Sequence, residues 1–171
     1  MSIKLKLLNI ADSDKWLELQ RETYKPYLDE YKDCEGHPAA DTIDMIIARF
    51  KNPCCHFYFA YANKIIIGGI RIIWSENMKE YEIADLFVLP NFQNAGNGTR
   101  IVEMTEAKYP DAASWSLITG AEEQGNHHFY KKLGYSAIKN ISYDKANLTL
   151  FQKVMQKKQG DGGVAFCGSR C

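Results

Sequence analysis

Two glycines that follow a strand-like segment are the residues in this sequence best suited to chemistry. Residues 86–90 end an apolar run typical of a buried strand, and residues 91–98 form a turn-rich loop that contains Gly96 and Gly98. Residues 99–104 then have helical character. The first amides of a helix have no acceptor within it, and glycines let the backbone approach a bound phosphate closely. The segment therefore predicts a cradle for a pyrophosphate group.

The cradle matches neither of two common phosphate-binding motifs. No Gly-Lys-Ser or Gly-Lys-Thr follows the glycines, so the loop is not a Walker loop. Two glycines after a strand in the middle of the chain also do not make a dinucleotide-binding fingerprint. For Gly-x-Gly taken alone, a simple tight turn is the alternative interpretation.

Residues 93–98, Gln-Asn-Ala-Gly-Asn-Gly, resemble the signature Gln/Arg-x-x-Gly-x-Gly/Ala of the GCN5-related N-acetyltransferase (GNAT) family. Residues 129–135, Phe-Tyr-Lys-Lys-Leu-Gly-Tyr, look like that family's aromatic-Tyr-x-x-x-Gly-Phe/Tyr segment, at the expected distance from the glycine loop. The resemblance covers roughly residues 1–155. It implies the family's fold, with acetyl-CoA as co-substrate.

The resemblance also implies which residues hold acetyl-CoA. Backbone groups of one strand would pair with the pantetheine arm, the loop amides would hold the pyrophosphate, and one asparagine would add a contact. These residues are Leu86, Phe87, Val88, Gln93, Asn94, Ala95, Gly96, Asn97, Gly98, Thr99 and Asn126. Two residues depart from the family pattern: Gln93 replaces the commoner Arg, and Glu123 replaces the Asn that usually stands seven residues before the tyrosine.

Tyr130 matches the position where many family members keep a tyrosine near the CoA sulfur. A phenol can protonate a departing thiolate as a general acid; the alternative for Tyr130 is a core aromatic residue. The acceptor ammonium must lose a proton before it can attack, and a carboxylate is the usual base. Glu82 and Asp85 lie on the strand that leads to the glycine loop. Strand periodicity sends them to opposite faces, so we expect only one to meet the amine.

We favour Glu82 over Asp85 as the base, because its position resembles one where the family often has an acid. A solvated strand charge is the alternative interpretation of Glu82. A base is dispensable if the substrate amine is already partly neutral.

Hydrophobic periodicity predicts the element order β-α-α-β-β-β-α-β-α-β-β. The fold class is therefore α/β, a mixed, mostly antiparallel central sheet flanked by helices. A further helical piece is expected from Tyr27 toward Cys34. The predicted strands span residues 3–7, 57–61, 65–74, 80–89, 114–119, 135–143 and 148–154, and the predicted helices begin near residues 13, 42, 99 and 126.

Aromatic and acidic residues in the first third of the chain allow two interpretations. The rings of Trp16, Tyr24, Tyr27 and Tyr31 form a helix core face by default, but in the resembling family the first helices form the acceptor side of the cleft. Residues 9–48 hold ten acidic and four basic residues. These charges are either solvated faces or an acidic mouth suited to cationic amines.

Composition excludes several classes of protein. The 171 residues carry 21 basic and 21 acidic side chains, and this zero net charge disfavours nucleic-acid and membrane partners. Five cysteines without paired CxxC motifs indicate neither a metal site nor a disulfide framework. No apolar run approaches a membrane span or a signal peptide, so we expect a cytoplasmic protein. Residues 1–155 are predicted as one acetyltransferase domain and residues 156–171 as a flexible tail containing Gly and Cys.

Together these observations predict an acetyl-CoA-dependent N-acyltransferase. It would transfer acetyl directly to a primary amine of a small molecule or peptide. The alternative is a non-catalytic CoA-binding sensor or subunit of the same fold. Homodimers are common in the family, although the sequence identifies no interface.

Overall fold

The described chain comprises residues 2–27, 38–77, 79–143 and 146–156 of a computed structural model. Its elements follow the predicted order. The helical piece expected toward Cys34 and all but the first residue of the expected tail lie outside the described residues. The strands are β1 (Ile3–Leu7), β2 (Cys55–Ala62), β3 (Ile65–Trp74), β4 (Glu80–Val88), β5 (Ser114–Gly120), β6 (Ser136–Tyr143) and β7 (Ala146–Val154). The helices include α1 (Ser13–Tyr24), α3 (Ile43–Phe50), α4 (Asn97–Ala107) and α5 (Gln124–Lys132).

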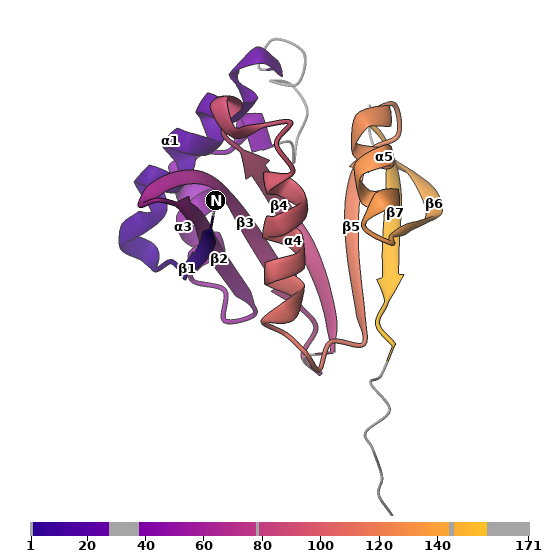
Figure 1. The fold of residues 1–171 in the computed structure, drawn as a ribbon. Coiled ribbons are helices and arrows are strands. Elements are labelled where there is room, and N and C mark those ends of the chain that lie inside the picture. Colours follow the sequence, from indigo (N-terminus) through magenta and orange to yellow (C-terminus); the bar gives the residue numbers. More distant parts are fainter. Residues whose placement is uncertain (1, 28–37, 78, 144–145, 157–171) are drawn as a thin grey trace, which may run out of the picture.

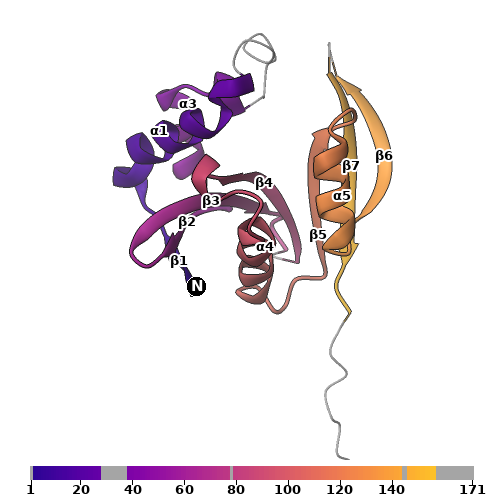
Figure 2. The same ribbon diagram turned by 45° about the horizontal axis from the view of Figure 1, so that its top comes forward.

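The strands form a single seven-stranded sheet in the order β1-β2-β3-β4-β5-β7-β6. Every neighbouring pair is antiparallel except β4 and β5, which are parallel. Helices α1 and α3 cover one face of β1–β4, α4 covers the other face, and α5 lies against β5, β7 and β6 (Figures 1 and 2). The prediction of a mixed, mostly antiparallel sheet flanked by helices is confirmed.

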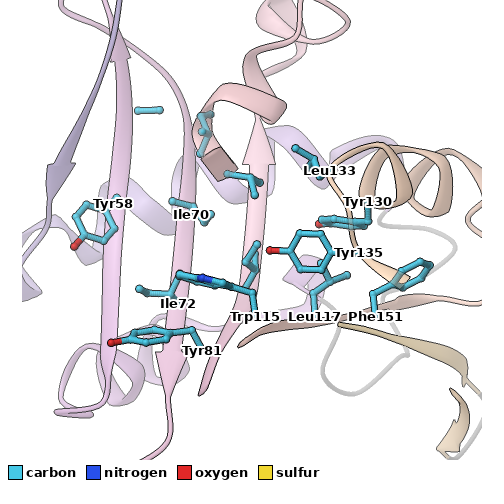
Figure 3. Packing of buried hydrophobic residues seen from close by; sticks show 14 of the residues in the cluster. Tyr58, Ile70, Ile72, Tyr81, Trp115, Leu117, Tyr130, Leu133, Tyr135 and Phe151 are labelled. Atoms are coloured by element: carbon cyan, nitrogen blue, oxygen red, sulfur yellow. The ribbon is translucent and has the colours of Figure 1, made fainter. Parts of the chain in front are cut away.

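Two hydrophobic cores form because both faces of the first four strands are covered. Under α1 and α3, Trp16 is fully buried, with its ring centroid 4.8 Å from that of Phe57 and 5.0 Å from that of Phe87. The second core lies on the α4 face and continues into the C-terminal strands (Figure 3). There the rings of Tyr81 and Trp115 stack at 4.9 Å, where β4 and β5 are still paired.

A close backbone approach at Gly69 sets the distance between α1 and the sheet. A Cβ at this residue would lie 2.7 Å from the Trp16 ring and 2.8 Å from the Phe87 ring. Gly69→Ala is therefore expected to lower the free energy of unfolding by about 1–3 kcal/mol, because the ring cluster must shift. Urea denaturation measures the loss. Gly125→Ala is the control: a Cβ there meets nothing within 4 Å, and alanine favours the helix, so unchanged or increased stability is expected.

A buried ionic network connects α4 with the C-terminal strands. The Glu106 carboxylate of α4 accepts hydrogen bonds from the Tyr135 hydroxyl at 2.7 Å and from the Lys153 ammonium at 2.6 Å. The Lys153 nitrogen also lies 5.5 Å from the centre of the Tyr135 ring. Because β4 and β5 share few hydrogen bonds, these contacts help to fix how the two parts of the sheet are placed around the site.

Candidate active site

Strands β4 and β5 pair at their beginnings and then separate. Within the described chain, their parallel pairing covers Glu80–Glu82 of β4 and Ser114–Ser116 of β5. β4 continues to Val88, whereas β5 pairs along its whole length with β7 on its other edge. Residues 83–88 of β4 therefore present an edge that β5 does not pair with. We call this region of β4, with the facing end of β5, the fork (Figures 1 and 2).

The backbone groups of β4 alternate in direction within the fork. The Leu89 amide donates to the Ile67 carbonyl at 2.9 Å, and the Phe87 carbonyl lies against β3. Because successive residues of a strand direct their amides and carbonyls to opposite edges, Leu86 and Val88 direct theirs toward β5. Of the three β4 residues predicted to hold the pantetheine arm, two thus face the fork. Phe87 instead faces β3, and its side chain lies in the core.

Two side chains, one from α1 and one from the glycine loop, bind the carbonyls that face the fork. The Tyr24 hydroxyl, at the end of α1, donates to the Leu86 carbonyl at 3.2 Å. The Gln93 side-chain amide donates to the Val88 carbonyl at 2.8 Å. The amides of Leu86 and Val88 point the same way as these carbonyls, so they are placed to donate to an extended ligand.

The glycine loop turns into α4 through left-handed backbone positions. Gly96 is the N-cap of α4 with a φ of 74°, and Asn94 has a φ of 59°. Gly96 has no side chain to cap the first amides of the helix. The buried Asn97 side chain donates to the Phe92 carbonyl at 2.8 Å, which fixes the loop. A row of amides at the positive end of the α4 dipole therefore lies directly after β4.

The other predicted loop residues surround this helix start. Ala95 is exposed and Thr99 is half-buried. A Cβ at Gly98 would lie 3.3 Å from the Phe129 ring, so α5 packs against the first turn of α4 at this point. The neighbour of Phe129 on α5 is Tyr130, and the packing therefore places Tyr130 close to the helix start.

Tyr130, which is buried, and Tyr24, which is half-buried, bring two phenols to the fork from distant parts of the chain. Burial raises the pKa of both hydroxyls, and the carboxylates of Asp85 and Glu123 raise them further. Both phenols therefore stay protonated at neutral pH. Tyr130 is 9% exposed and belongs to the core on the α4 face, where Figure 3 shows it near Tyr135 and Phe151. The sequence leaves open whether Tyr24 packs in the core or lines the acceptor side of the cleft. Its place at the fork depends on its contact with Leu86, 62 residues along the chain.

The prediction that Glu82 and Asp85 point to opposite faces is wrong. Arg71 pairs with Asp85 and Ile72 pairs with Ile83, so Ala84 is an extra residue in β4. This β-bulge reverses the alternation once. The two carboxylates therefore lie on the same face of the sheet, the one covered by α1 and α3.

The two carboxylates have different surroundings on that face. Asp85 is ion-paired with Arg71, and their side chains are only 5% and 12% exposed. Burial raises the pKa of Asp85, and the Arg71 guanidinium opposes that shift. Glu82 is half-buried at the last residue pair that joins β4 to β5, where the fork begins. Burial raises the pKa of Glu82 as well, with Arg71 again opposing.

The start of α5 forms the wall of the fork beyond the end of β5. Asn126 donates its side-chain amide to Glu123 and, at 3.1 Å, to the Thr119 hydroxyl. Sequence reasoning noted Glu123 only as a departure from the family pattern and assigned it no role. Its spacing of seven residues before Tyr130 is the sequence feature that points to a position at the site. His127 lies on the same helix, and its Nε2 is 3.0 Å from the Gly120 carbonyl.

The described residues contain neither a metal-binding cluster nor a membrane-spanning helix. They hold no group of three or more His, Cys, Asp or Glu side chains arranged to bind a metal ion. None of the helices in the described ranges has the length and apolar character needed to cross a membrane.

The fold is shared with solved acetyltransferase structures. A PaiA N-acetyltransferase from Thermoplasma acidophilum in complex with coenzyme A has a TM-score of 0.71 at 19% identity, covering 91% of this chain and 100% of that chain. The ribosomal-protein-S18-alanine N-acetyltransferase of Escherichia coli has a TM-score of 0.72 at 10% identity, covering 94% and 98%. The spermidine N-acetyltransferase of Vibrio cholerae, in complex with CoA and spermine, has a TM-score of 0.69 at 12% identity, covering 89% and 95%.

Sequence comparison extends this likeness to the family level. None of the curated proteins matches the chain. The family model described as Acetyltransferase (GNAT) family matches residues 14–135, a range that runs from α1 through the fork and α4 to the end of α5. The match includes both motifs singled out in the sequence. The chain therefore belongs to the GNAT family of acetyltransferases.

Proposed function

We propose that this protein transfers an acetyl group from acetyl-CoA to a primary amine of a small molecule or peptide, by direct attack of the amine on the thioester. The observation that carries the proposal is the fork: the Leu86 and Val88 amides face it, and the α4 amides lie directly after it. An extended arm that ends in a pyrophosphate needs this sequence of donors.

The chain's own residues would hold acetyl-CoA largely through the backbone. Leu86 and Val88 would donate to the pantetheine arm as a further strand does, and the amides of residues 94–99 would hold the pyrophosphate. Gln93 supports this arrangement by fixing the loop to the end of β4. Acetyl-CoA, when bound, supplies the activated acetyl group and a thiolate leaving group.

Tyr130 would supply the proton that the departing thiolate needs. Its raised pKa keeps the hydroxyl protonated at neutral pH, as a general acid requires. Tyr130 packs against Phe129, which contacts Gly98 in the first turn of α4, and this supports a position near the proposed acetyl-CoA site.

Glu82 would accept the proton of the amine through a water molecule, because the carboxylate of Asp85 is already ion-paired with Arg71. The raised pKa of Glu82 makes its carboxylate a stronger proton acceptor than an ordinary glutamate. The excess of acidic over basic residues in residues 9–48 also favours a cationic acceptor electrostatically.

Glu82→Gln is expected to lower kcat/KM about tenfold at neutral pH, because water must then take the proton unaided. In the wild type, kcat/KM should fall as the pH drops through the Glu82 pKa, which lies above the ordinary value for glutamate. The variant should lose this acid limb. Glu80→Gln, an exposed carboxylate on the same strand, is the control. An unchanged acid limb in Glu82→Gln would assign the proton to another group.

Amine acceptors are also named for the structurally similar proteins. One acts on spermidine, and another on an alanine of a ribosomal protein. The proposal therefore keeps both small-molecule and peptidyl primary amines.

Thermal unfolding with and without acetyl-CoA tests whether the fork binds its proposed ligand. A ligand that binds only the folded state at 100 times its Kd adds about 2.7 kcal/mol of stability. For a chain of this size that raises Tm by about 5–10 °C. No shift at millimolar acetyl-CoA would exclude both the enzyme and a CoA-binding protein without activity. A shift without turnover of any amine would leave the second.

A further inference from the structure

The Glu123 carboxylate is held in a fixed place on the β5 side of the fork. Its Oε2 accepts hydrogen bonds from the Thr119 hydroxyl at 3.0 Å and from the Asn126 side-chain amide. A Cβ at Gly120 would lie 3.1 to 3.3 Å from the Glu123 side chain, so the glycine leaves the room that the carboxylate occupies. Among the described residues, Oε1 accepts no hydrogen bond and keeps its full capacity.

The Glu123 carboxylate makes no hydrogen bond to the first backbone amides of α5. Glu123 is the N-cap of α5, where a short polar side chain such as Asp or Ser would accept from the first free amides. It makes no such cap hydrogen bond, and its side chain turns to Thr119 and Asn126 instead. A purely structural role in helix capping therefore does not explain its orientation.

The carboxylate faces the residues that mark the site. Glu123 raises the pKa of Tyr130 on its own helix and of Tyr24 at the end of α1. Tyr24 is hydrogen-bonded to the Leu86 carbonyl at the β4 edge. Its hydrogen bonds to Thr119 of β5 and Asn126 of α5 place Glu123 on the wall formed by β5 and α5, on the side of the fork away from β4.

The charge of Glu123 is also uncompensated, unlike that of the other carboxylate near the two phenols. Asp85 is paired with the Arg71 guanidinium. The partners of Glu123 within the described ranges are a hydroxyl and an amide, both neutral, and no salt bridge to it occurs there. A fixed, half-buried carboxylate without a paired cation is well placed to bind a positively charged ligand, because the ligand supplies the missing charge.

We propose that Glu123 binds the ammonium group of a cationic acceptor through its Oε1. The inference rests on the proposed acetyl transfer and names its substrate class: alkyl amines that are protonated at neutral pH, in preference to neutral amines. The contact is made to the acceptor before it loses its proton, so it contributes to binding more than to the chemical step.

Steady-state kinetics of Glu123→Gln test this assignment with benzylamine as the cationic acceptor. The expected result is a rise in KM for benzylamine of about 10- to 100-fold with kcat changed only a few-fold, because the ammonium then donates to a neutral amide oxygen instead of a carboxylate. Aniline, which is neutral, should keep its KM or its competitive inhibition constant. Glu122→Gln, the exposed neighbouring carboxylate, should behave as the wild type for both amines.

The possible failures can be told apart. If the wild type binds acetyl-CoA but acetylates no amine, the proposed function is wrong and this inference falls with it. If the wild type is active and Glu123→Gln keeps its KM for benzylamine, the inference alone is overturned. Equal losses for benzylamine and aniline, or loss of the acetyl-CoA-induced thermal shift in the variant, would also overturn it, because Glu123 would then support the fold or the cofactor.

Discussion

Replacing Tyr130 with phenylalanine is expected to lower kcat for acetyl transfer by at least about 100-fold, while the acetyl-CoA-induced thermal shift stays nearly unchanged. The phenol holds its proton at neutral pH because burial and two nearby carboxylates raise its pKa. Phenylalanine keeps the ring, which belongs to the core on the α4 face, but removes the hydroxyl that would protonate the thiolate.

Tyr109→Phe is the matched control for this experiment. Tyr109 follows α4. Its hydroxyl oxygen lies 2.7 Å from the Tyr58 hydroxyl oxygen and 2.7 Å from Nδ1 of His56. The 11 residues of α4 rise about 16 Å, so Tyr109 is far from the glycine loop at the other end of the helix. Turnover should therefore be unchanged in Tyr109→Phe. Equal turnover in Tyr130→Phe and the wild type would remove Tyr130 from the mechanism and leave it a core residue.

Replacing Arg71 with alanine is expected to lower the free energy of unfolding by about 3–5 kcal/mol, because it leaves Asp85 buried without its partner. For a chain of this size the loss corresponds to a fall in Tm of about 6–20 °C. Chemical denaturation followed by circular dichroism measures it. The double variant Arg71→Met/Asp85→Leu should recover most of the loss, since a buried pair can be replaced by apolar side chains.

The same substitution should make stability depend on pH. Without the Arg71 guanidinium, only the charge of Arg49 opposes the burial that raises the pKa of Asp85, so folding favours the protonated acid. The destabilisation in Arg71→Ala should be smallest below the unfolded-state pKa of aspartate and should grow as the pH rises through the folded-state value. A loss below about 1 kcal/mol at neutral pH would show that the pair is solvated rather than buried.

The sequence predicted the element order and the glycine loop because both depend on local patterns. Gly96 adopts the left-handed conformation that a glycine before a helix indicates, and β4 leads directly to it. Both family motifs lie on the elements that surround the fork. Such local patterns are reliable predictors here, because nearby residues determine the conformation of the loop and of the first turn of α4.

The β-bulge in β4 could not be predicted, because its burial pattern alternates without a break. Tyr81 and Ile83 pack in the core under α4, whereas Phe87 and Leu89 pack in the core under α1. Both faces of the sheet are covered, so buried side chains recur at every second residue although the chain has changed face at Ala84. The relative placement of Glu82 and Asp85 depends on this one extra residue.

The contact of Tyr24 at the fork could not be predicted from the sequence either, because it joins segments 62 residues apart. Tyr24 meets Leu86 only after α1 has packed across the sheet, and nothing near Tyr24 in the sequence indicates that partner. Glu123 is a single departure from the family pattern, and the sequence alone does not show that Thr119 and Asn126 fix its carboxylate.

Acetyl transfer by this protein is measured by amine-dependent release of the CoA thiol from acetyl-CoA, followed together with the acetylated amine by mass spectrometry. We predict stoichiometric release of thiol and formation of the N-acetylated product with at least one protonated primary amine, and loss of both in Tyr130→Phe. Acetyl-CoA binding without amine-dependent thiol release across a panel of small and peptidyl amines would contradict the account and identify a CoA-binding protein without transferase activity.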